Sequence, residues 1–587
     1  MVKRGATRRG CRYAPLCEVI VARWLFLVLA CVSGCDKAAE PAEDTGAATA
    51  GTGGDSGDVT AEDTGTEDTE DTDAPGGDTS DTDTGPADTG GGYAPGWYLD
   101  CEGGADGADG RSPDTALGSL AVVNALTLGP GDALWIKRGT ACVGQLAPKG
   151  SGNAAAPITV GAYGDGALPV IDAVGELAAL TLADQSHWNI SQLALTGSGP
   201  HGVYITSAYG TAAGLTLSDL QVHDVYTGDG ISGKATGLVV LTTVGTPGRF
   251  EDVLIDGVSA WSTDQWAGIF IYGAEYGSGT DKSANVVVRN STVHDVQGDG
   301  IALFGARDSV IETSLTYNTG LQTVETVGTP NAIWTWSCDR CTVQYNEGYA
   351  SYSPGVDGGI YDIDWATNDN VVQYNYGHDA QAYCVSIFGA EGRTTTNAVV
   401  RYNVCADNGQ SSPDAGDVFL ATWSGGDIDG VQIYNNTFSW MTGTSWHVVR
   451  DEAEYVGGNP RFFRNNLIVT DSDWMVSSGG LVDFDHNLWW SSSPDPVWFE
   501  ITGGRWYEGV AGWQGAGRGD GSLWADPLLA GAAGADGLKL TAGSPAGDAG
   551  AVITGAGGCD FWGGEVGASP DIGAHELGAS AGAACGP

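Results

Sequence analysis

The chain has 587 residues and an acidic composition, with 73 Asp and Glu against 25 Lys and Arg and a formal net charge of −48. Binding to nucleic acid needs a basic surface, so we expect no nucleic-acid partner, and bare polyanionic polysaccharides should also be repelled. The 93 glycines and 3 methionines, together with abundant Val, Thr, Tyr and Trp, favour strands joined by tight turns.

The N-terminus has the features of an export signal. Basic residues within 3–12 precede the apolar run 19–30, which is too short to span a membrane. The sequence Val32-Ser33-Gly34-Cys35 then resembles the bacterial lipobox, in which the cysteine is lipidated; a plain secretory signal is the alternative. We expect residues 1–35 to be a lipoprotein signal peptide. Lipid on Cys35 would anchor the exported protein at the cell surface or on the periplasmic side of a bacterial envelope, as its only membrane contact.

Four further regions are predicted after the signal. Residues 36–92 consist almost entirely of Asp, Glu, Thr, Gly, Ala, Ser and Pro, which predicts a disordered acidic linker. A calcium-binding repeat is the alternative there, although the spacing of its Asp residues is irregular. Residues 93–148 should form an N-terminal cap and the first strands, with helical apolar spacing over 119–126. We assign 149–525 to a β-helix and 526–587 to a closing segment.

A strand followed by a polar corner recurs along the chain. Val286–Asn290 (VVVRN), Ala398–Asn403 (AVVRYN) and Val431–Asn435 (VQIYN) are examples. Repeats of 22 to 37 residues predict one coil of a parallel β-helix each, with the longer ones carrying loops. Asn at one corner can hydrogen-bond to the Asn of the next coil. We align the polar residues into one predicted corner column: Gln192, Asp219, Asp256, Asn290, Thr313, Asn346, Asn375, Asn403, Asn435, Asn465 and Asn487.

A second column of strands follows the corners and carries the candidate site. In Gly359–Trp365, Tyr361 and Ile363 should face one way, whereas Asp362 and Asp364 should point to solvent, because burying carboxylates is costly. Neighbouring coils stand about 4.8 Å apart, so outward aromatic residues of preceding coils should lie beside this pair. The residues that we expect to bind substrate are Phe270, Tyr272, Phe304, Trp334 and Trp336.

The cysteines after the signal suggest disulfides, as is typical of exported proteins. Cys338 and Cys341 form a CxxC, for which we expect a small structural loop or links to neighbouring coils; the second ligand pair that zinc needs is missing from the sequence. The pairs that we predict are Cys101 with Cys142, Cys384 with Cys405, and Cys559 with Cys585.

Several segments of the sequence resemble those of a known superfamily. The segments are GADGADGRSPDTALGSL, VHDVQGDGIALFGARDSV, DGGIYDID before VVQYNYGHD, and the closing GSPAGDAG with DIGAHE. They are similar to segments of bacterial right-handed parallel β-helix proteins of the pectin-lyase-like superfamily. The resemblance covers roughly residues 95–577 and implies an all-β, right-handed parallel β-helix (solenoid) with a short N-terminal capping helix. Many members are polysaccharide lyases, glycoside hydrolases or epimerases. The Arg-x-Pro-x-x-Arg motif of pectate lyases and the Asp-Asp with Arg-x-Lys set of polygalacturonases are both missing, so no catalytic set can be transferred.

Carboxylates supply the candidate chemistry. We take Asp299, Asp357, Asp362 and Asp364, with His378 at a corner, as candidate catalytic residues. Carboxyl groups two residues apart on a strand can lie about 5–9 Å apart, the range of retaining and inverting glycosidases. One would act as general acid and the other as nucleophile or base. Asp357, Asp362 and Asp364 also suit Ca²⁺, which prefers oxygen ligands.

These residues have structural interpretations as well. Asp299 precedes Gly300, as turn residues often do. His378-Asp379 has counterparts at other corners, and a repeated feature is more often architectural than catalytic. Trp334 and Trp336 could simply pack beneath the loop 322–329.

Three functions therefore stay open. The first is a monomeric, surface-anchored protein that binds, and could cleave, an extracellular polysaccharide, more readily a neutral one, as a glycoside hydrolase does. The second is a Ca²⁺-assisted polysaccharide lyase with Lys234 or Arg307 as its base. The third is a surface or adhesion scaffold without catalytic activity.

Overall fold

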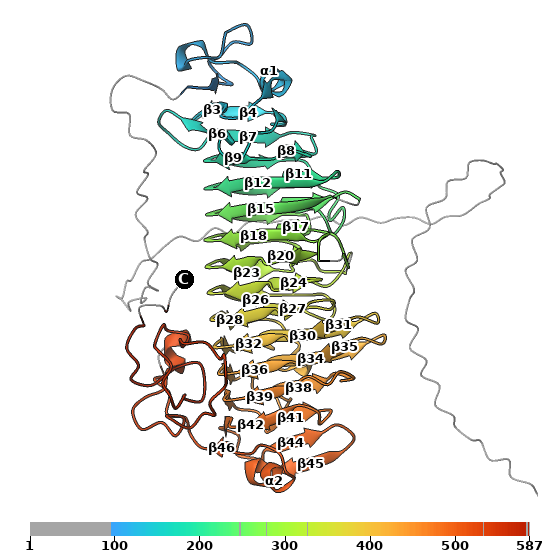
Figure 1. Cartoon of the computed structure of the whole chain (residues 1–587), viewed down its shortest axis with the longest axis vertical. Coiled ribbons are helices and arrows are strands. Elements are labelled where there is room, and N and C mark those ends of the chain that lie inside the picture. Colours follow the sequence, from blue (N-terminus) through green and yellow to red (C-terminus); the bar gives the residue numbers. More distant parts are fainter. Residues whose placement is uncertain are drawn as a thin grey trace, which may run out of the picture. The chain divides into compact units, whose positions relative to one another are not determined.

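The structure, a computed structural model, describes residues 95–245, 248–277, 279–325, 327–531, 533–582 and 585. The predicted signal peptide, the lipidation site at Cys35 and the acidic linker lie outside the described residues. From β1 onward the chain winds into stacked coils whose strands form three long sheets (Figure 1). Strands of successive coils pair in parallel, so the predicted parallel β-helix is confirmed.

Three sheets, called sheets 1, 2 and 3, run along the stack. Sheet 1 contains β1 (Trp97–Leu99), β3 (Ala133–Lys137), β6 (Ile158–Tyr163), β9 (Trp188–Ser191), β12 (Thr211–Ser218), β15 (Arg249–Asp256), β18 (Ser283–Arg289), β21 (Ala306–Arg307), β22 (Val310–Glu312), β25 (Thr342–Gln344), β28 (Val371–Gln373), β32 (Val399–Arg401), β36 (Gln432–Tyr434), β39 (Phe462–Arg464) and β42 (Asp483–Asp485). Sheet 2 contains β4 (Ala141–Val143), β7 (Val170–Ala173), β10 (Ala194–Gly197), β13 (Gln221–Val225), β16 (Ser259–Thr263), β19 (Thr292–His294), β23 (Leu315–Thr319), β26 (Glu347–Ser351), β29 (Tyr376–His378), β33 (Val404–Ala406), β37 (Thr437–Trp440), β40 (Leu467–Thr470), β43 (Leu488–Ser491) and β46 (Leu523–Trp524). Sheet 3 contains β8 (Ala178–Ala183), β11 (His201–Ser207), β14 (Gly237–Thr243), β17 (Ala267–Tyr272), β20 (Ile301–Phe304), β24 (Ile333–Trp336), β27 (Tyr361–Ile363), β30 (Val385–Ala390), β34 (Val418–Trp423), β38 (Val449–Glu452), β41 (Trp474–Ser478), β44 (Trp498–Ile501) and the antiparallel β45 (Arg505–Glu508).

The core lies inside the coils. Ile269, Ile301, Ile333 and Tyr361 occupy one register position in successive strands of sheet 3, and all four are fully buried. Each such side chain contributes about 1.5–3 kcal/mol relative to leaving it exposed. Because every coil adds the same inward positions, the core is one continuous cluster along the stack.

A ladder of buried polar side chains stabilises the corner between sheets 1 and 2. The Asn375 side-chain oxygen accepts the backbone N–H of Asn346 at 2.9 Å, and the Asn375 amide donates to Asn403 at 3.0 Å. Such bonds satisfy buried corner groups without water. The described members are Ser291, Ser314, Asn346, Asn375, Asn403, Asn436, Asn466, Asn487 and Ser522.

The predicted corner column is therefore partly wrong. Asn346, Asn375, Asn403 and Asn487 belong to the ladder as predicted. Asn290, Thr313, Asn435 and Asn465 stand one residue earlier, where φ lies between 47° and 55°. The corner uses two consecutive residues, because one turns the backbone through the left-handed region and the next bonds across the coils.

Short helices cover the ends of the coils. The predicted capping helix is confirmed as α1 (Leu120–Ala125), which buries Leu120 and Val123. At the other end, α2 (Gly509–Gly515) buries Trp513, which stacks on Phe499 at 5.4 Å. The remaining elements are β2 (Thr127–Leu128) with β5 (Lys149–Gly150), β31 (Thr394–Thr396) with β35 (Asp427–Asp429), and the 3₁₀ turns η1 (Pro113–Thr115), η2 (Pro413–Ala415) and η3 (Ala535–Leu538).

The segment after β46 packs against the side of the stack. Its Leu540, Ala546 and Ile572 are buried against Leu467 and Leu488 of sheet 2. The backbone of this segment also bonds to corner residues, as when Gly573 N–H donates to the Asn465 carbonyl. Within the described residues, no helix is both long and apolar enough to cross a bilayer.

The three predicted disulfides are confirmed. They join Cys101 to Cys142, Cys384 to Cys405, and Cys559 to Cys585. Cys338 and Cys341 are instead free thiols buried in the core, so the predicted loop or inter-coil links are wrong for this pair.

Candidate active site

Sheet 3 places two aspartates on its outer side, beside the tryptophans of β24. Asp362 is the register partner of Trp334 in one neighbouring coil and of Ser386 in the other. Asp364 follows β27 and continues the pairing, since its N–H donates to the Thr335 carbonyl. Tyr361 and Ile363 lie in the core, so the predicted alternation of this strand is confirmed.

The same aspartates are buried, contrary to the prediction that they point to solvent. Asp362 is 2% exposed and Asp364 is 6% exposed. The outer side of sheet 3 is covered by the chain's own loops, from which Ile231 and Val327 pack onto the ring layer beside the aspartates. This layer, called the outer aromatic cluster, consists of Trp266, Phe270, Phe304, Trp334 and Trp336 with Val240, Ala267 and Ala302.

The predicted aromatic platforms are mostly closed as well. Phe270 and Phe304 are fully buried and pack edge to face, with centroids 4.7 Å apart and planes at 89°. Trp334 and Trp336 are also buried, and the contact of Val327 agrees with the interpretation that they lie beneath the loop 322–329. Tyr272 is half-buried, and its hydroxyl donates to Glu275. A ring packed on both sides offers no face to a sugar, so the prediction is wrong for Phe270 and Phe304.

Asn331 connects two of the aspartates. Its backbone N–H donates to Asp299 and its side-chain amide to Asp362, both at 3.3 Å. The Asn331 side-chain oxygen accepts from Gly359 N–H at 2.9 Å and from the Tyr383 hydroxyl at 3.1 Å. The remaining oxygens bind Trp266, whose indole N–H donates to Asp299 at 2.6 Å, and Ser386, whose hydroxyl donates to Asp362 at 2.7 Å.

Tyr383 brings Asp357 into the same network. Its hydroxyl donates to Asp357 at 2.6 Å, and the Thr329 hydroxyl donates to the other Asp357 oxygen at 2.5 Å. The Tyr383 ring packs directly against Gly359 of the neighbouring coil, where a Cβ atom would lie 2.1 Å from the ring. Glycine at 359 is therefore required for this contact. Asp357 stays partly exposed at the rim of the site.

Burial raises the pKa of all four aspartates. The pKa of Asp362 lies well above its usual value because of burial and then the charge of Asp357; that of Asp364 is raised likewise by burial and the charge of Asp362. Burial raises the pKa of Asp299 to about 6, although Lys234 and Trp266 act against it. For Asp357, burial raises the pKa while the Thr329 and Tyr383 hydroxyls lower it. Each of these carboxyls therefore binds its proton more tightly than an exposed aspartate does.

Lys234 supplies positive charge to the site. Its ammonium lies 5.2 Å from the Phe304 ring centroid and 5.3 Å from that of Trp334, and it lowers the pKa of Asp364. Arg307, the other base considered for a lyase, lies on sheet 1 and pairs with Asp308 at 2.8 Å. The lyase alternative therefore retains only Lys234 of its two bases.

His378 does not join the aspartates. It lies on sheet 2, where its ring stacks between Tyr349 at 4.9 Å and Tyr376 at 4.4 Å. Its ring nitrogens contact Asp379 and Glu347. Burial alone would lower its pKa, but these two hydrogen bonds outweigh burial and raise the pKa. This placement agrees with the architectural interpretation of the corner histidines.

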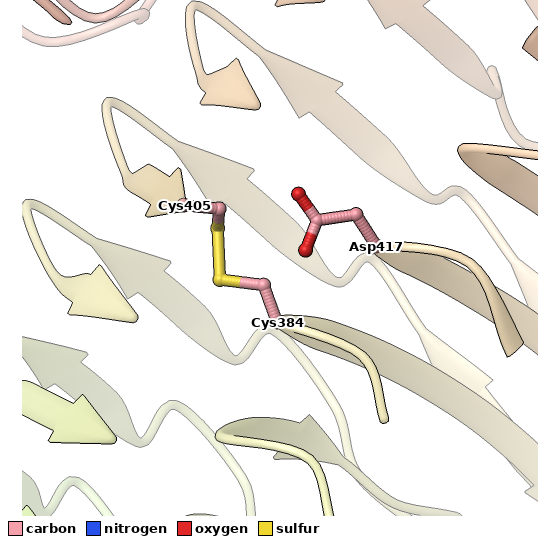
Figure 2. Close-up of side chains that lie close together, drawn as sticks. All are labelled: Cys384, Cys405 and Asp417. Carbon is pink, nitrogen blue, oxygen red and sulfur yellow. A yellow bond between two sulfur atoms is a disulfide. The ribbon is translucent and has the colours of Figure 1, made fainter. Parts of the chain in front are cut away.

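The predicted calcium ligands are not grouped as a cation site. Within the described residues, the group of His, Cys, Asp or Glu ligand atoms lying within 4.8 Å of one another is Cys384, Cys405 and Asp417. Figure 2 shows that these cysteines are joined in a disulfide, with the Asp417 carboxylate beside it. Asp357 and Asp362 already receive hydrogen bonds on both oxygens, so the donor set does not fit Ca²⁺ without rearrangement.

The sequence pattern did not single out Asn331, Tyr383, Ser386 or Trp266 as site residues. A signal for two of them was present. Counting back two residues from the aligned core positions Ile301, Ile333, Tyr361 and Val385 gives one column, whose members are Asp299, Asn331, Gly359 and Tyr383.

Coils whose strands stack into three long parallel sheets define a parallel β-helix protein. The family model described as "Right handed beta helix region" matches residues 239–438. The predicted right-handed parallel β-helix is thereby confirmed.

Three known proteins illustrate the similarity. A lacto-N-biosidase of Bifidobacterium longum subsp. longum is 25% identical over 511 residues, which cover 68% of this chain and 31% of that protein. The chain thus spans about a third of the length of this curated relative. A crystal structure of a GH136 lacto-N-biosidase from Eubacterium ramulus matches with 21% identity and a TM-score of 0.49, covering 67% of each chain. An alginate lyase from Paenibacillus matches with 15% identity and a TM-score of 0.36, covering 54% of this chain and 97% of the other.

Proposed function

We propose that this protein binds and hydrolyses a neutral extracellular glycan at the outer side of sheet 3, by the paired-carboxylate mechanism of glycoside hydrolases. The observation that carries the proposal is a set of interacting carboxyls whose environments shift their pKa values by different amounts, directly beside Trp334 and Trp336. Such separation assigns acid and base roles within one site.

Asp364 fits the general acid. Within the described residues, the Asp364 carboxylate accepts a single hydrogen bond, from the Trp365 backbone N–H at 3.0 Å. Little therefore stabilises its negative charge. Burial and the charge of Asp362 raise its pKa well above the usual value. The raised pKa favours the protonated form of Asp364, and donation of that proton to the glycosidic oxygen would make the leaving group neutral.

Asp357 fits the nucleophile or base. It is partly exposed, so substrate can approach it. The hydroxyls of Thr329 and Tyr383 both donate to its carboxylate and favour the ionised form. Its charge also raises the pKa of Asp364, so the two carboxyls interact. Direct attack by Asp357 would retain the anomeric configuration, whereas activation of water would invert it.

Asp362 and Asp299 fit positioning roles. Both accept hydrogen bonds from neutral donors and are almost completely buried. The charge of Asp362 raises the pKa of Asp364. The positive charge of Lys234 partly compensates the negative charge of these buried carboxyls. A single nearby cation would not neutralise a chain of uronates, which favours a neutral substrate.

The experiment is a substrate panel. A chromogenic lacto-N-bioside, suggested by the named relatives, and neutral polysaccharides should yield new reducing ends, and Asp364→Asn should abolish them. Alginate and pectate should yield no unsaturated uronate. Unsaturated product from either polymer would favour the lyase alternative with Lys234 as base. Absence of any cleavage by the wild-type protein would favour the scaffold.

We also propose that the protein is exported and lipid-anchored through Cys35. The three disulfides of the described part support an oxidising compartment. Labelled palmitate should be incorporated into the wild-type protein and into Cys31→Ser, but not into Cys35→Ser. Equal labelling of the Cys35 variant would contradict the assignment.

A further inference from the structure

The corner between sheets 1 and 2 carries one left-handed residue per coil. Three consecutive coils place tyrosine there, with φ of 55° at Tyr345, 55° at Tyr374 and 51° at Tyr402. Bulky residues rarely adopt this conformation. The preceding coils use the small polar residues Asn290 and Thr313 at the same position, with φ of 50° and 47°.

The three tyrosine rings form a short stack that we call the corner stack. Tyr345 and Tyr374 have centroids 5.1 Å apart and planes at 14°, and Tyr374 and Tyr402 are 5.7 Å apart at 18°. Stacking at this spacing is favourable for aromatic rings. A stack of three rings has two terminal faces, and the surroundings of these two faces differ.

The chain itself covers the Tyr402 end. Tyr402 is 2% exposed, and it lines a small pocket of about 100 Å³ together with residues of the C-terminal segment that include Ile553, Gly557 and Pro570. Arg401 ties this segment down by donating to the Gly555 carbonyl at 2.9 Å. The segment approaches so closely that a Cβ on Gly557 would lie 3.1 Å from the Tyr374 hydroxyl oxygen.

The Tyr345 end borders a cavity of about 350 Å³. At this end the preceding coil supplies Thr313, which is far smaller than a fourth tyrosine and leaves room for the cavity. Tyr345 is half-buried. Its ring stacks on Tyr374, and the residue also lines the cavity. The volume lies at the lower end of the range for small-ligand pockets.

We propose that this cavity binds one neutral pyranose ring of a glycan, with the apolar face of the sugar against Tyr345. Leu315 adds a second apolar surface, and Thr292 lines the cavity with a hydroxyl that suits a sugar hydroxyl. Asn290 and Thr313 also line it, where the Thr313 hydroxyl donates to the Asn290 side-chain oxygen at 2.9 Å and the Asn290 amide donates to Asp256 at 2.7 Å. Glu347 also lines it, with its side chain 48% exposed. Its carboxylate can accept from sugar hydroxyls and disfavours a uronate.

The inference does not depend on the hydrolytic site. The cavity lies at the corner between sheets 1 and 2, whereas the aspartates lie on the outer side of sheet 3. A non-catalytic subsite would hold a long glycan on the surface whether or not the aspartates cleave it, and it would raise the local concentration of sugar chains.

The test measures sugar binding by the full chain with saturation-transfer NMR and titration. The probes are methyl β-D-galactopyranoside, N-acetyl-D-glucosamine and D-glucuronate. Tyr345→Asn removes the ring and keeps a residue type that this corner already uses. Thr313→Tyr keeps Tyr345 but fills the cavity with a further ring. We expect each variant to weaken binding of a neutral probe by about tenfold or more and to leave glycan hydrolysis unchanged.

Two controls separate this site from the aspartates. Tyr209→Asn removes a tyrosine that is 84% exposed elsewhere, and Asp364→Asn disables the proposed hydrolysis; both should bind the probes at the corner as the wild-type protein does. Wild-type protein that binds neither neutral probe would overturn the inference. So would undiminished binding by Tyr345→Asn, or tighter binding of D-glucuronate than of the neutral sugars.

Discussion

The outer sides of sheets 2 and 3 both carry rows of rings, but the rows are packed differently. On sheet 2 the rings lie almost parallel, as in Tyr317 and Tyr349 with planes at 4°, and they stay half-buried. On sheet 3 Phe270 and Phe304 meet at 89° and are fully buried. The sheet 2 row is His223, Trp261, His294, Tyr317, Tyr349 and His378.

This difference separates a repeated structural feature on sheet 2 from a candidate catalytic group on sheet 3. On sheet 2 one ring per coil repeats, and its histidines pair with the next residue in the chain, as His378 does with Asp379. The carboxyl network of sheet 3 does not repeat along the stack, because each coil contributes different residues to it. Its aspartates also have raised pKa values. A non-repeating group with shifted pKa values is the better candidate for catalysis.

The largest expected effect comes from the aspartates of sheet 3. Asp364→Asn and Asp357→Asn should each lower kcat/KM by about 10²–10⁴-fold, because each removes a proton-transfer group or nucleophile. Asp379→Asn on sheet 2 is the matched control and should leave kcat/KM unchanged. Steady-state kinetics on the cleaved glycan measure all three. Equal losses in the Asp379 variant would remove the distinction between the two sheets.

A second prediction concerns how stability depends on pH. Burial raises the pKa of Asp299 from 3.8 to about 6, so the folded state binds this proton more tightly than the unfolded state does. Folding should lose about 3 kcal/mol from this group as pH rises from about 4 through about 6, and no more above that. Asp299→Asn should show a correspondingly flatter profile in urea unfolding, whatever its absolute stability.

The control for that profile is again Asp379→Asn, whose side chain is 59% exposed and whose profile should parallel the wild type. A parallel profile for Asp299→Asn as well would mean that Asp299 is ionised throughout the range, contrary to its burial.

A smaller effect is expected from the rings of sheet 2. His378→Ser removes one ring from the row and should cost about 0.5–1.5 kcal/mol of unfolding free energy, without changing kcat/KM. The hydrogen bonds to Glu347 and Asp379 raise the pKa of His378 despite burial. Their contribution is therefore present below the ordinary pKa of 6.5 and is lost as pH rises through the raised value. The partners are about half exposed, so this part should stay below about 1 kcal/mol.

The smallest expected effect is that of metal removal. Because the carboxylates of Asp357 and Asp362 are occupied by neutral donors and Lys234 supplies charge nearby, EDTA should leave hydrolysis and the melting temperature unchanged. Restoration of activity by added Ca²⁺ after EDTA treatment would instead support the predicted cation site and the lyase alternative. Mg²⁺ at the same concentration is the control.

Local pattern was enough to predict the coils and part of the site. Alternation in β27 correctly separated Asp362 from Tyr361, because a strand has a period of two. Cys384 and Cys405 could be paired from their spacing alone, since it corresponds to about one coil. The corner column failed by one residue at Asn290 because two polar residues stand together there, and sequence does not say which one bonds across coils.

Burial of the aspartates could not be predicted in the same way. Val327 and Ile231 come from loops of other coils and pack on the aromatic rings beside the aspartates, on the outer side of sheet 3. No periodic signal marks a loop that folds back over a sheet. Tyr383 was missed for a related reason: its reach to Asp357 depends on the empty space at Gly359, which only the superposition of coils reveals.

The polar ladder at the corner has a consequence for how such a chain can change over evolutionary time. Each rung binds only the rungs directly above and below, so the stack has no intrinsic length and tolerates duplication or loss of a coil that carries Asn or Ser at this position. The coils that bring Asp299, Asn331, Asp357 and Tyr383 together have no such freedom. An inserted coil between them would leave the stack intact and separate these side chains by the thickness of one strand.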